Sequence, residues 1–296
     1  MALNIRKLSY ALGAEITGVD LRGVLSDDTI AAIRKAWLEH LVLVLPGQDI
    51  TPEQHIAFGA RFGQLDDHAA LYKFRHPDYP EIFLVTTKPK ADGSPSDSRQ
   101  IGFNWHSDMS YTLRPAMGSL LHCREITEVG GDTMFSNTYV AYDTLSEGFK
   151  KLIEPLWAVH DLTYGGRTAE GRDPEITVAL RKANPSVMQP MVRVHSETGR
   201  KTLYVSEGIA NQIVGMTIEE SRPILEYLFQ HAARPEFVYR HYWRRHDLVM
   251  WDNRCTMHNA LQNRAPGMIR HMHRVTVLGT PCGQLYREAP AQQAAA

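Results

Sequence analysis

The stretch "DLVMWDNRCTMH", Asp247 to His258, contains an apolar segment, a polar turn and a histidine within twelve residues. Residues 248–251 form a short apolar run that is typical of a buried strand. The polar residues 252–254 can hold a tight turn and orient one ring nitrogen of the histidine that follows. The segment therefore predicts a buried strand that presents His258 as a candidate ligand just beyond its end.

Other short apolar segments along the 296 residues have the same character. Strands are expected within 3–22, where Gly13 breaks them, and at 41–45, 117–122, 191–195, 202–205, 236–243, 247–252 and 270–278. Helices are expected after the N-caps Ser26, Thr51 and Thr217 and at 139–153, with the Thr217 helix ending near residue 233. Many short strands with helices at one end predict a mainly β fold with flanking helices, a barrel or jelly roll. One domain over 1–296 is expected, with lid-like insertions near 88–100 and 161–190.

Composition excludes several functional classes. The net charge of −1 gives no reason to expect a nucleic-acid partner. No apolar run approaches the roughly 18 residues of a membrane span, and the first residues lack the apolar core of a signal peptide. The three widely spaced cysteines predict reduced thiols and a cytoplasmic location.

A second pair of candidate ligands lies in "NWHSDMSY", residues 104–111. If this segment is a strand, His106 and Asp108 project from the same face. An imidazole and a carboxylate are two-thirds of the 2-His-1-carboxylate set that leaves positions open on Fe(II). The same tripeptide is also frequent on strand surfaces without a metal. His258 is the best candidate for the third ligand.

The strand expected at 270–278 carries two arginines on one face, Arg270 and Arg274. A buried guanidinium needs an anion, so the pair fits the recognition of carboxylates. An edge strand with solvated arginines fits the residues equally well.

Four segments, "WHSD", "GGDTMFSN", "WDNRCTMH" and "RHMHRVTVLG", follow one another in a recognisable order and spacing. The chain resembles the taurine/2,4-dichlorophenoxyacetate dioxygenase family of Fe(II)/2-oxoglutarate oxygenases from about residue 8 to about residue 280. Segment 236–255 is similar to the phenoxyacetate branch, and segment 207–216 to the taurine and alkylsulfate branch.

The resemblance implies a double-stranded β-helix of the cupin type, with Fe(II) bound by His106, Asp108 and His258. It further implies that Arg270 and Thr133 bind 2-oxoglutarate. The interval from His258 to Arg270 is one residue longer than is common in the family, and the "RAPG" turn can absorb it.

The resemblance also assigns residues to the prime substrate, namely Arg274 to its anionic group and His68 to its binding. Trp105 and Tyr111 are expected to form walls of the pocket. Gly102 stands where taurine enzymes have a substrate-contacting asparagine, which argues against taurine itself. The expected substrate is a small anion: a sulfonate, a sulfate ester or an aryloxyalkanoate.

The implied reaction uses 2-oxoglutarate and O₂, releases succinate and CO₂, and hydroxylates the substrate. Family members often form homodimers or homotetramers. Two alternatives remain from the residues alone. A zinc hydrolase uses a similar ligand set, although it needs no carboxylate clamp. A regulatory protein on an inactive oxygenase fold is the other, although all three ligands are present.

Overall fold

The structure is a computed structural model that describes residues 3–90, 92–96, 98, 102–163, 178, 181–265 and 267–287. Within these ranges, the largest sheet has seven strands. Their spatial order is β1 (Asn4–Lys7), β2 (Ala14–Thr17), β3 (Val42–Leu45), β13 (Leu248–Asp252), β5 (Ala116–Ile126), β15 (Arg270–Leu278) and β4 (Ile82–Thr86). The strands predicted from 3–22, 41–45, 117–122, 247–252 and 270–278 are all in this main sheet, which confirms a mainly β fold.

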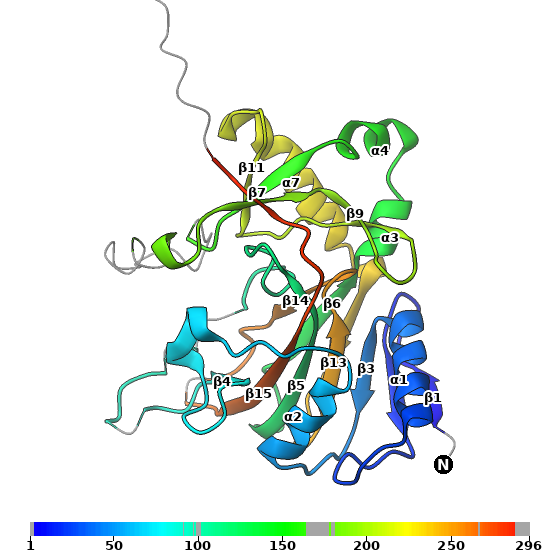
Figure 1. Ribbon diagram of the computed structural model, residues 1–296, viewed down its shortest axis with the longest axis vertical. Coiled ribbons are helices and arrows are strands. Elements are labelled where there is room, and N and C mark those ends of the chain that lie inside the picture. The colour runs from blue at the N-terminus through cyan, green and yellow to red at the C-terminus, as the bar shows by residue number, and fades with distance from the viewer. Residues whose placement is uncertain are drawn as a thin grey trace, which may run out of the picture.

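Two helices cover one face of the main sheet (Figure 1). They are α1 (Asp27–His40) and α2 (Pro52–Ala60), and both begin at the predicted N-caps. The Ser26 side chain accepts from Thr29 N, and Thr51 forms a complete capping box with Gln54. Their apolar side chains pack against this face of the sheet, so α1 and α2 close one side of the core.

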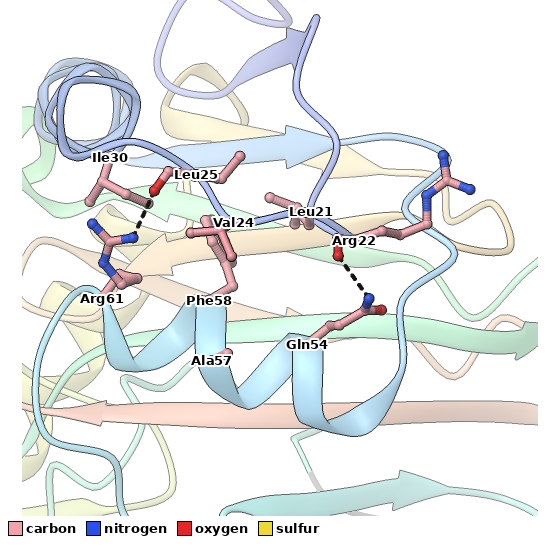
Figure 2. A pocket seen from close by; sticks show the side chains of 10 residues that line it. Leu21, Arg22, Val24, Leu25, Ile30, Gln54, Ala57, Phe58 and Arg61 are labelled. Atoms are coloured by element: carbon pink, nitrogen blue, oxygen red, sulfur yellow. Dashed lines mark hydrogen bonds between the residues drawn. The ribbon is translucent and has the colours of Figure 1, made fainter.

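A hollow of about 240 Å³ lies between α2 and the 21–25 loop (Figure 2). Gln54 Nε2 donates to Arg22 O at 2.9 Å, and Arg61 Nη1 donates to Leu25 O at 3.0 Å. These bonds fix α2 to the loop. The hollow is on the helix-covered face of the sheet, opposite the face that carries Arg274.

The rest of the chain forms smaller sheets and a helical end, which Figure 1 shows above the main sheet. Among the described residues, the three smaller sheets follow the spatial orders β12-β6-β14, β11-β7-β8-β16 and β10-β9. Their strands are β6 (Thr133–Asn137), β7 (Trp157–His160), β8 (Val187–Pro190), β9 (Val192–Val194), β10 (Lys201–Leu203), β11 (Ala210–Ile213), β12 (Val238–His241), β14 (Thr256–Ala260) and β16 (Gln284–Leu285). The other helices named in the described part of the chain are α3 (Thr138–Asp143), α4 (Glu147–Ile153), α7 (Ile218–Ala232) and the 3-10 segments η1 (Ala69–Phe74), which is kinked at Leu71, and η3 (Pro235–Phe237).

The predicted helix over 139–153 is wrong in one respect, because the segment forms two helices. α3 ends at Asp143, and Ser146 then caps α4 by accepting from Phe149 N. A second N-cap inside the segment starts a new helix in place of continuing the first. The helix predicted from Thr217 is confirmed as α7, with its capping box.

The two predicted insertions have different outcomes. Most of 161–190 lies outside the described residues, but its end forms strand β8, which the sequence analysis did not predict. The described part of 88–100 is held at the end of β4, because Ser98 Oγ accepts from Thr86 N and donates to Thr86 O. Their action as lids remains a prediction.

The three cysteines are free thiols, as predicted. None of the helices in the described part of the chain has the length and apolar character needed to cross a membrane.

Histidines gather on the helix-covered face of the main sheet. His122 on β5 and His273 on β15 are cross-strand neighbours. The ring of His55 on α2 lies 5.7 Å from His122, and the ring of His271 lies 5.1 Å from His273. Burial lowers the pKa of His122 to about 4 and that of His273 to about 3, so both rings are neutral near pH 7.

This histidine group predicts acid sensitivity. The unfolded chain protonates these rings near pH 6.5, whereas the folded chain resists protonation until pH 3 to 4. Their contribution to the free energy of unfolding is therefore complete above about pH 6.5 and is lost as the pH falls. In urea denaturation, His273→Gln should reduce the loss between about pH 7.5 and pH 5 by about 2 kcal/mol. If the free energy of unfolding of His273→Gln falls between these pH values as much as that of a His246→Gln control, the prediction is contradicted.

Candidate metal centre

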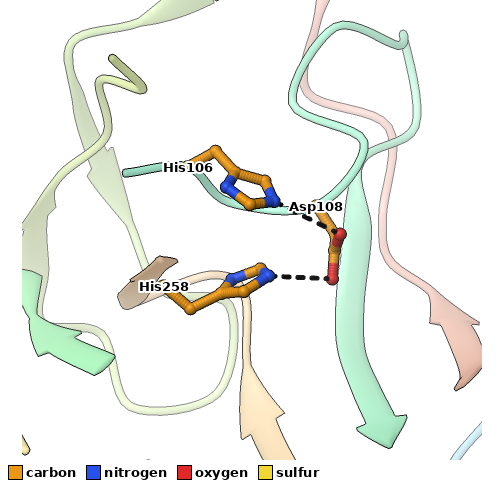
Figure 3. Close-up of side chains that lie close together, drawn as sticks. All are labelled: His106, Asp108 and His258. Carbon is orange, nitrogen blue, oxygen red and sulfur yellow. Dashed lines mark ion pairs between the residues drawn. The ribbon is translucent and has the colours of Figure 1, made fainter. Parts of the chain in front are cut away.

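Three side chains from distant parts of the sequence converge: His106, Asp108 and His258 (Figure 3). His106 Nε2 lies 3.9 Å from Asp108 Oδ1, and His258 Nε2 lies 3.9 Å from Asp108 Oδ2. One ligand atom of each residue lies within 4.8 Å of the others. This donor set is that of the 2-His-1-carboxylate site, which holds Fe(II) and leaves positions open for other ligands.

Residues 104–111 do not form the strand considered for His106 and Asp108. His106 makes only an isolated β-bridge with His258. The backbone N–H of His106 donates to His258 O, and the backbone N–H of His258 donates to His106 O. Ser107 then starts a turn, in which Ser110 N donates to Ser107 O at 3.4 Å. The Ser107 N–H donates to Ser206 Oγ and its hydroxyl to Thr256 O, and these bonds hold the turn in place. The bridge sets the two histidines opposite each other, and the turn brings Asp108 to their ring nitrogens.

Both imidazoles are in the form that a metal requires. His106 Nδ1 lies 2.7 Å from Asn104 O and donates to it, which leaves the Nε2 lone pair facing Asp108. Burial lowers the pKa of His106, and lowers that of His258 well below its ordinary value. His258 Nδ1 has no partner among the described residues, so the expectation that the 252–254 turn orients this nitrogen is wrong.

The carboxylate of Asp108 is buried and held on both oxygens. Arg274 Nη1 donates to Oδ1 at 2.5 Å, and Ser119 Oγ donates to Oδ2 at 2.6 Å. Burial by itself would raise the pKa of Asp108, but Arg274 and the two histidines hold that pKa well below its ordinary value. The ligand is therefore ionised.

The 252–254 turn supports Asp108 instead of His258. Asn253 Oδ1 accepts from Asp108 N at 3.1 Å and from Trp251 Nε1 at 3.0 Å, while its Nδ2 donates to Ser119 Oγ at 2.9 Å. Ser119 was missed in the sequence analysis. A hydroxyl in the middle of the apolar segment "AMGSLL" was the available signal.

Arg270 lies in a second polar site next to this centre. Its side chain is 6% exposed, its Nε donates to Gly131 O at 3.0 Å and its Nη2 lies 3.4 Å from Thr133 Oγ1. Burial lowers the pKa of Arg270 to about 10. No carboxylate among the described residues forms an ion pair with it, so the guanidinium fits an anion from outside the chain.

Thr133 lies beside Arg270 and could bind the same anion. Trp243 Nε1 donates to Thr133 Oγ1 at 3.0 Å, so the threonine hydroxyl keeps its own hydrogen for another acceptor. The alternative of an edge strand with solvated arginines is wrong, because β15 lies between β5 and β4 and Arg274 is only 9% exposed.

A cavity of about 220 Å³ opens beside the metal centre. Its lining is mainly apolar and includes Leu71, Phe74, Phe83, Phe103, Met109, Leu162 and Ile209. Arg274 and Tyr111 line it as expected, and the Arg274 guanidinium lies 4.6 Å from the centre of the Phe83 ring. Trp105 was expected in this wall but packs into the core around α7, because it faces away from the neighbouring His106.

His68 lies behind the cavity wall. Its Nδ1 is 2.8 Å from Asp66 Oδ2, and its ring is 5.3 Å from that of Phe83. His68 Nε2 is buried and has no partner among the described residues. The described residues thus leave one buried hydrogen-bonding atom unsatisfied beside Phe83.

A second group of metal-binding residue types consists of His195, Asp252 and Cys255. Arg254 donates to both oxygens of Asp252, and His195 Nε2 also bonds to one of them at 3.0 Å. The carboxylate is thus satisfied by the protein itself. The group is a buried hydrogen-bonded support for the turn between β13 and β14.

Comparisons with known proteins agree with this geometry. The family model for the taurine catabolism dioxygenase TauD, TfdA family, matches residues 4–276. An alpha-ketoglutarate-dependent 2,4-dichlorophenoxyacetate dioxygenase of Burkholderia sp. is 34% identical, over 95% of this chain and 96% of the relative. An (S)-phenoxypropionate/alpha-ketoglutarate-dioxygenase of Sphingobium herbicidovorans is 34% identical, over 88% and 89%. The crystal structure of AAD-2 with Mn(II) and N-oxalylglycine is similar at a TM-score of 0.82 and 36% identity, covering 97% of this chain and 100% of that one.

The support of Asp108 by Ser119 predicts a loss of metal affinity on substitution. Ser119→Ala should weaken Mn(II) binding about 10- to 100-fold, because residues that orient a ligand typically contribute that much. Calorimetric titration with Mn(II) measures the affinity. Ser136→Ala is a matched control, since this buried hydroxyl donates to Ala232 O away from the centre. Equal affinity in the two variants would contradict the role of Ser119.

Proposed function

This chain belongs to the TauD/TfdA family of dioxygenases, and we propose that His106, Asp108 and His258 bind its Fe(II). The chain is an Fe(II)- and 2-oxoglutarate-dependent dioxygenase. We further propose that Arg270 and Thr133 bind 2-oxoglutarate, and that Arg274, His68 and Tyr111 bind the substrate.

One observation carries these assignments: two buried guanidinium groups flank a single His-Asp-His cluster. Arg270 has no carboxylate partner among the described residues, and Thr133 beside it keeps a free hydroxyl hydrogen. The two together suit the distal carboxylate of 2-oxoglutarate. Arg274 bonds to Asp108 of the cluster and lines the cavity where a substrate fits.

When bound, Fe(II) with 2-oxoglutarate and O₂ supplies the oxidation, which converts 2-oxoglutarate to succinate and CO₂ and hydroxylates the substrate. The protein's own residues do the rest. Arg274 orients the substrate by its anionic group, so that one C–H bond faces the centre. The apolar walls around Phe74 and Phe83 exclude water from this position.

The cavity favours an anion with an apolar body. Phe74, Phe83 and Phe103 line it, and their rings suit an aryl group better than the polar chain of taurine. The relatives named above act on 2,4-dichlorophenoxyacetate and (S)-phenoxypropionate. We therefore place an aryloxyalkanoate ahead of a sulfonate or a sulfate ester as the substrate.

We also propose that the main sheet and the β12-β6-β14 sheet are the two walls of a double-stranded β-helix. Support comes from the chain order, since β5, β13 and β15 lie in the main sheet while β6, β12 and β14 lie in the smaller one. One domain over 1–296, the lids at 88–100 and 161–190, a homo-oligomer and a cytoplasmic location remain predictions.

The zinc hydrolase, the alternative that the ligand set allows, is not supported by the relatives, which are 2-oxoglutarate-dependent dioxygenases. Purified protein should form succinate only with Fe(II), 2-oxoglutarate and O₂ together, and an added aryloxyalkanoate should stimulate this. Succinate is measured by chromatography, with His106→Ala as the blank. Turnover with zinc under nitrogen, without succinate, would contradict the proposal.

The two arginines should have separable roles. Arg270→Gln removes a charged hydrogen-bond donor from the 2-oxoglutarate site, so the KM for 2-oxoglutarate should rise about 10- to 100-fold. Arg274→Gln should instead raise the KM for the substrate by a similar factor when Fe(II) is saturating, a condition needed because Arg274 also bonds to Asp108. Steady-state oxygen uptake measures both constants. If either substitution changes the two KM values equally, the assignment is wrong.

A further inference from the structure

The substrate cavity contains a carboxylate that the reaction does not use. Glu207 lines the cavity together with Arg274 and the metal-centre residues His106 and Asp108. Among the described residues, no hydrogen bond or ion pair involves the Glu207 side chain. By contrast, Asp108 is paired with Arg274, and nearby Asp66 is paired with His68.

The backbone around Glu207 is fixed against the loop that carries the metal ligands. The preceding residue, Ser206, accepts a hydrogen bond from Ser107 N at 3.1 Å. The following residue, Gly208, has φ +75°, and a Cβ there would lie 2.7 Å from Asn104 Nδ2. Both neighbours of Glu207 therefore contact the 104–107 segment. These contacts fix the backbone of Glu207 at the cavity, where the residue is half-buried.

The cavity therefore has a positive and a negative side chain from two different elements. Arg274 enters from β15 of the main sheet, and Glu207 enters from the turn between β10 and β11. The other lining side chains are mainly apolar, including Phe74 and Ile209. An acid bound through Arg274 thus has a carboxylate near its apolar body, and a partly desolvated carboxylate attracts hydrogen-bond donors and repels a second anion.

We propose that Glu207 determines substrate specificity by selecting acids that carry a protonated amine, or another hydrogen-bond donor, away from their anionic group. The inference rests on the proposed function, because it concerns the substrate of the same site. Glu207 discriminates against diacids by the same charge. It acts on the substrate and leaves the binding of 2-oxoglutarate unchanged.

The test compares three acids of one shape: phenoxyacetate and its para-aminomethyl and para-carboxy derivatives. The measured quantity is kcat/KM for succinate formation by the Fe(II) enzyme. The unsubstituted protein should prefer the aminomethyl acid to the carboxy acid. Glu207→Gln should reduce this preference about tenfold, as expected for the loss of one charged hydrogen bond. Glu207→Lys should reverse it.

Glu219→Gln, in the first turn of α7, is the matched control and should keep the preference. If both substitutions at Glu207 change kcat/KM equally for all three acids, the inference is overturned.

Calorimetric binding of the aminomethyl and carboxy acids to the Fe(II) protein under nitrogen separates the two proposals. A preference that Glu207→Lys reverses, without succinate formation, supports the role of Glu207 and contradicts the proposed reaction. Equal affinities for the two acids in the unsubstituted protein overturn the inference whether or not succinate is formed.

Discussion

The buried carboxylate of Asp108 is the constraint on which the centre of this structure depends. A carboxylate removed from water costs several kcal/mol unless charges and hydrogen bonds compensate it. Here Arg274 bonds to one oxygen and Ser119 to the other, and the two histidine rings face both. The same contacts that make burial possible also aim the carboxylate at His106 and His258.

This compensation requires strands that are far apart in sequence. Ser119 comes from β5, Arg274 from β15 and His258 from β14, while Asn253 just beyond β13 holds both Ser119 and the backbone of Asp108. In the main sheet, β5 is the strand between β13 and β15. The three-residue connection 253–255 between β13 and β14 then carries the chain into the other sheet. The centre thus lies where the two sheets meet.

The charged side chains around the centre come from two kinds of element, a strand and a turn. The arginines come from β15, where burial and a neighbouring ring hold each guanidinium in one place. Glu207 comes from the turn between β10 and β11, and its side chain has no hydrogen bond or ion pair within the described part of the chain. A rigid cationic pair on a strand and a carboxylate on a turn suit an enzyme with one reaction type whose substrate choice is set by the turn.

Local periodicity, capping and motif spacing were enough to predict the candidate ligand types, the two arginines on one face of a strand, the capped helices α1, α2 and α7 and the family. Three features became visible only in the folded chain: His106 lies in a bridge and turn instead of a strand, Asn253 supports Asp108 and not His258, and Trp105 faces the core. The same holds for Ser119 and Glu207, whose roles come from neighbours more than ten residues away. Such contacts depend on which strands pair and where the sheets meet, and no local pattern contains that information.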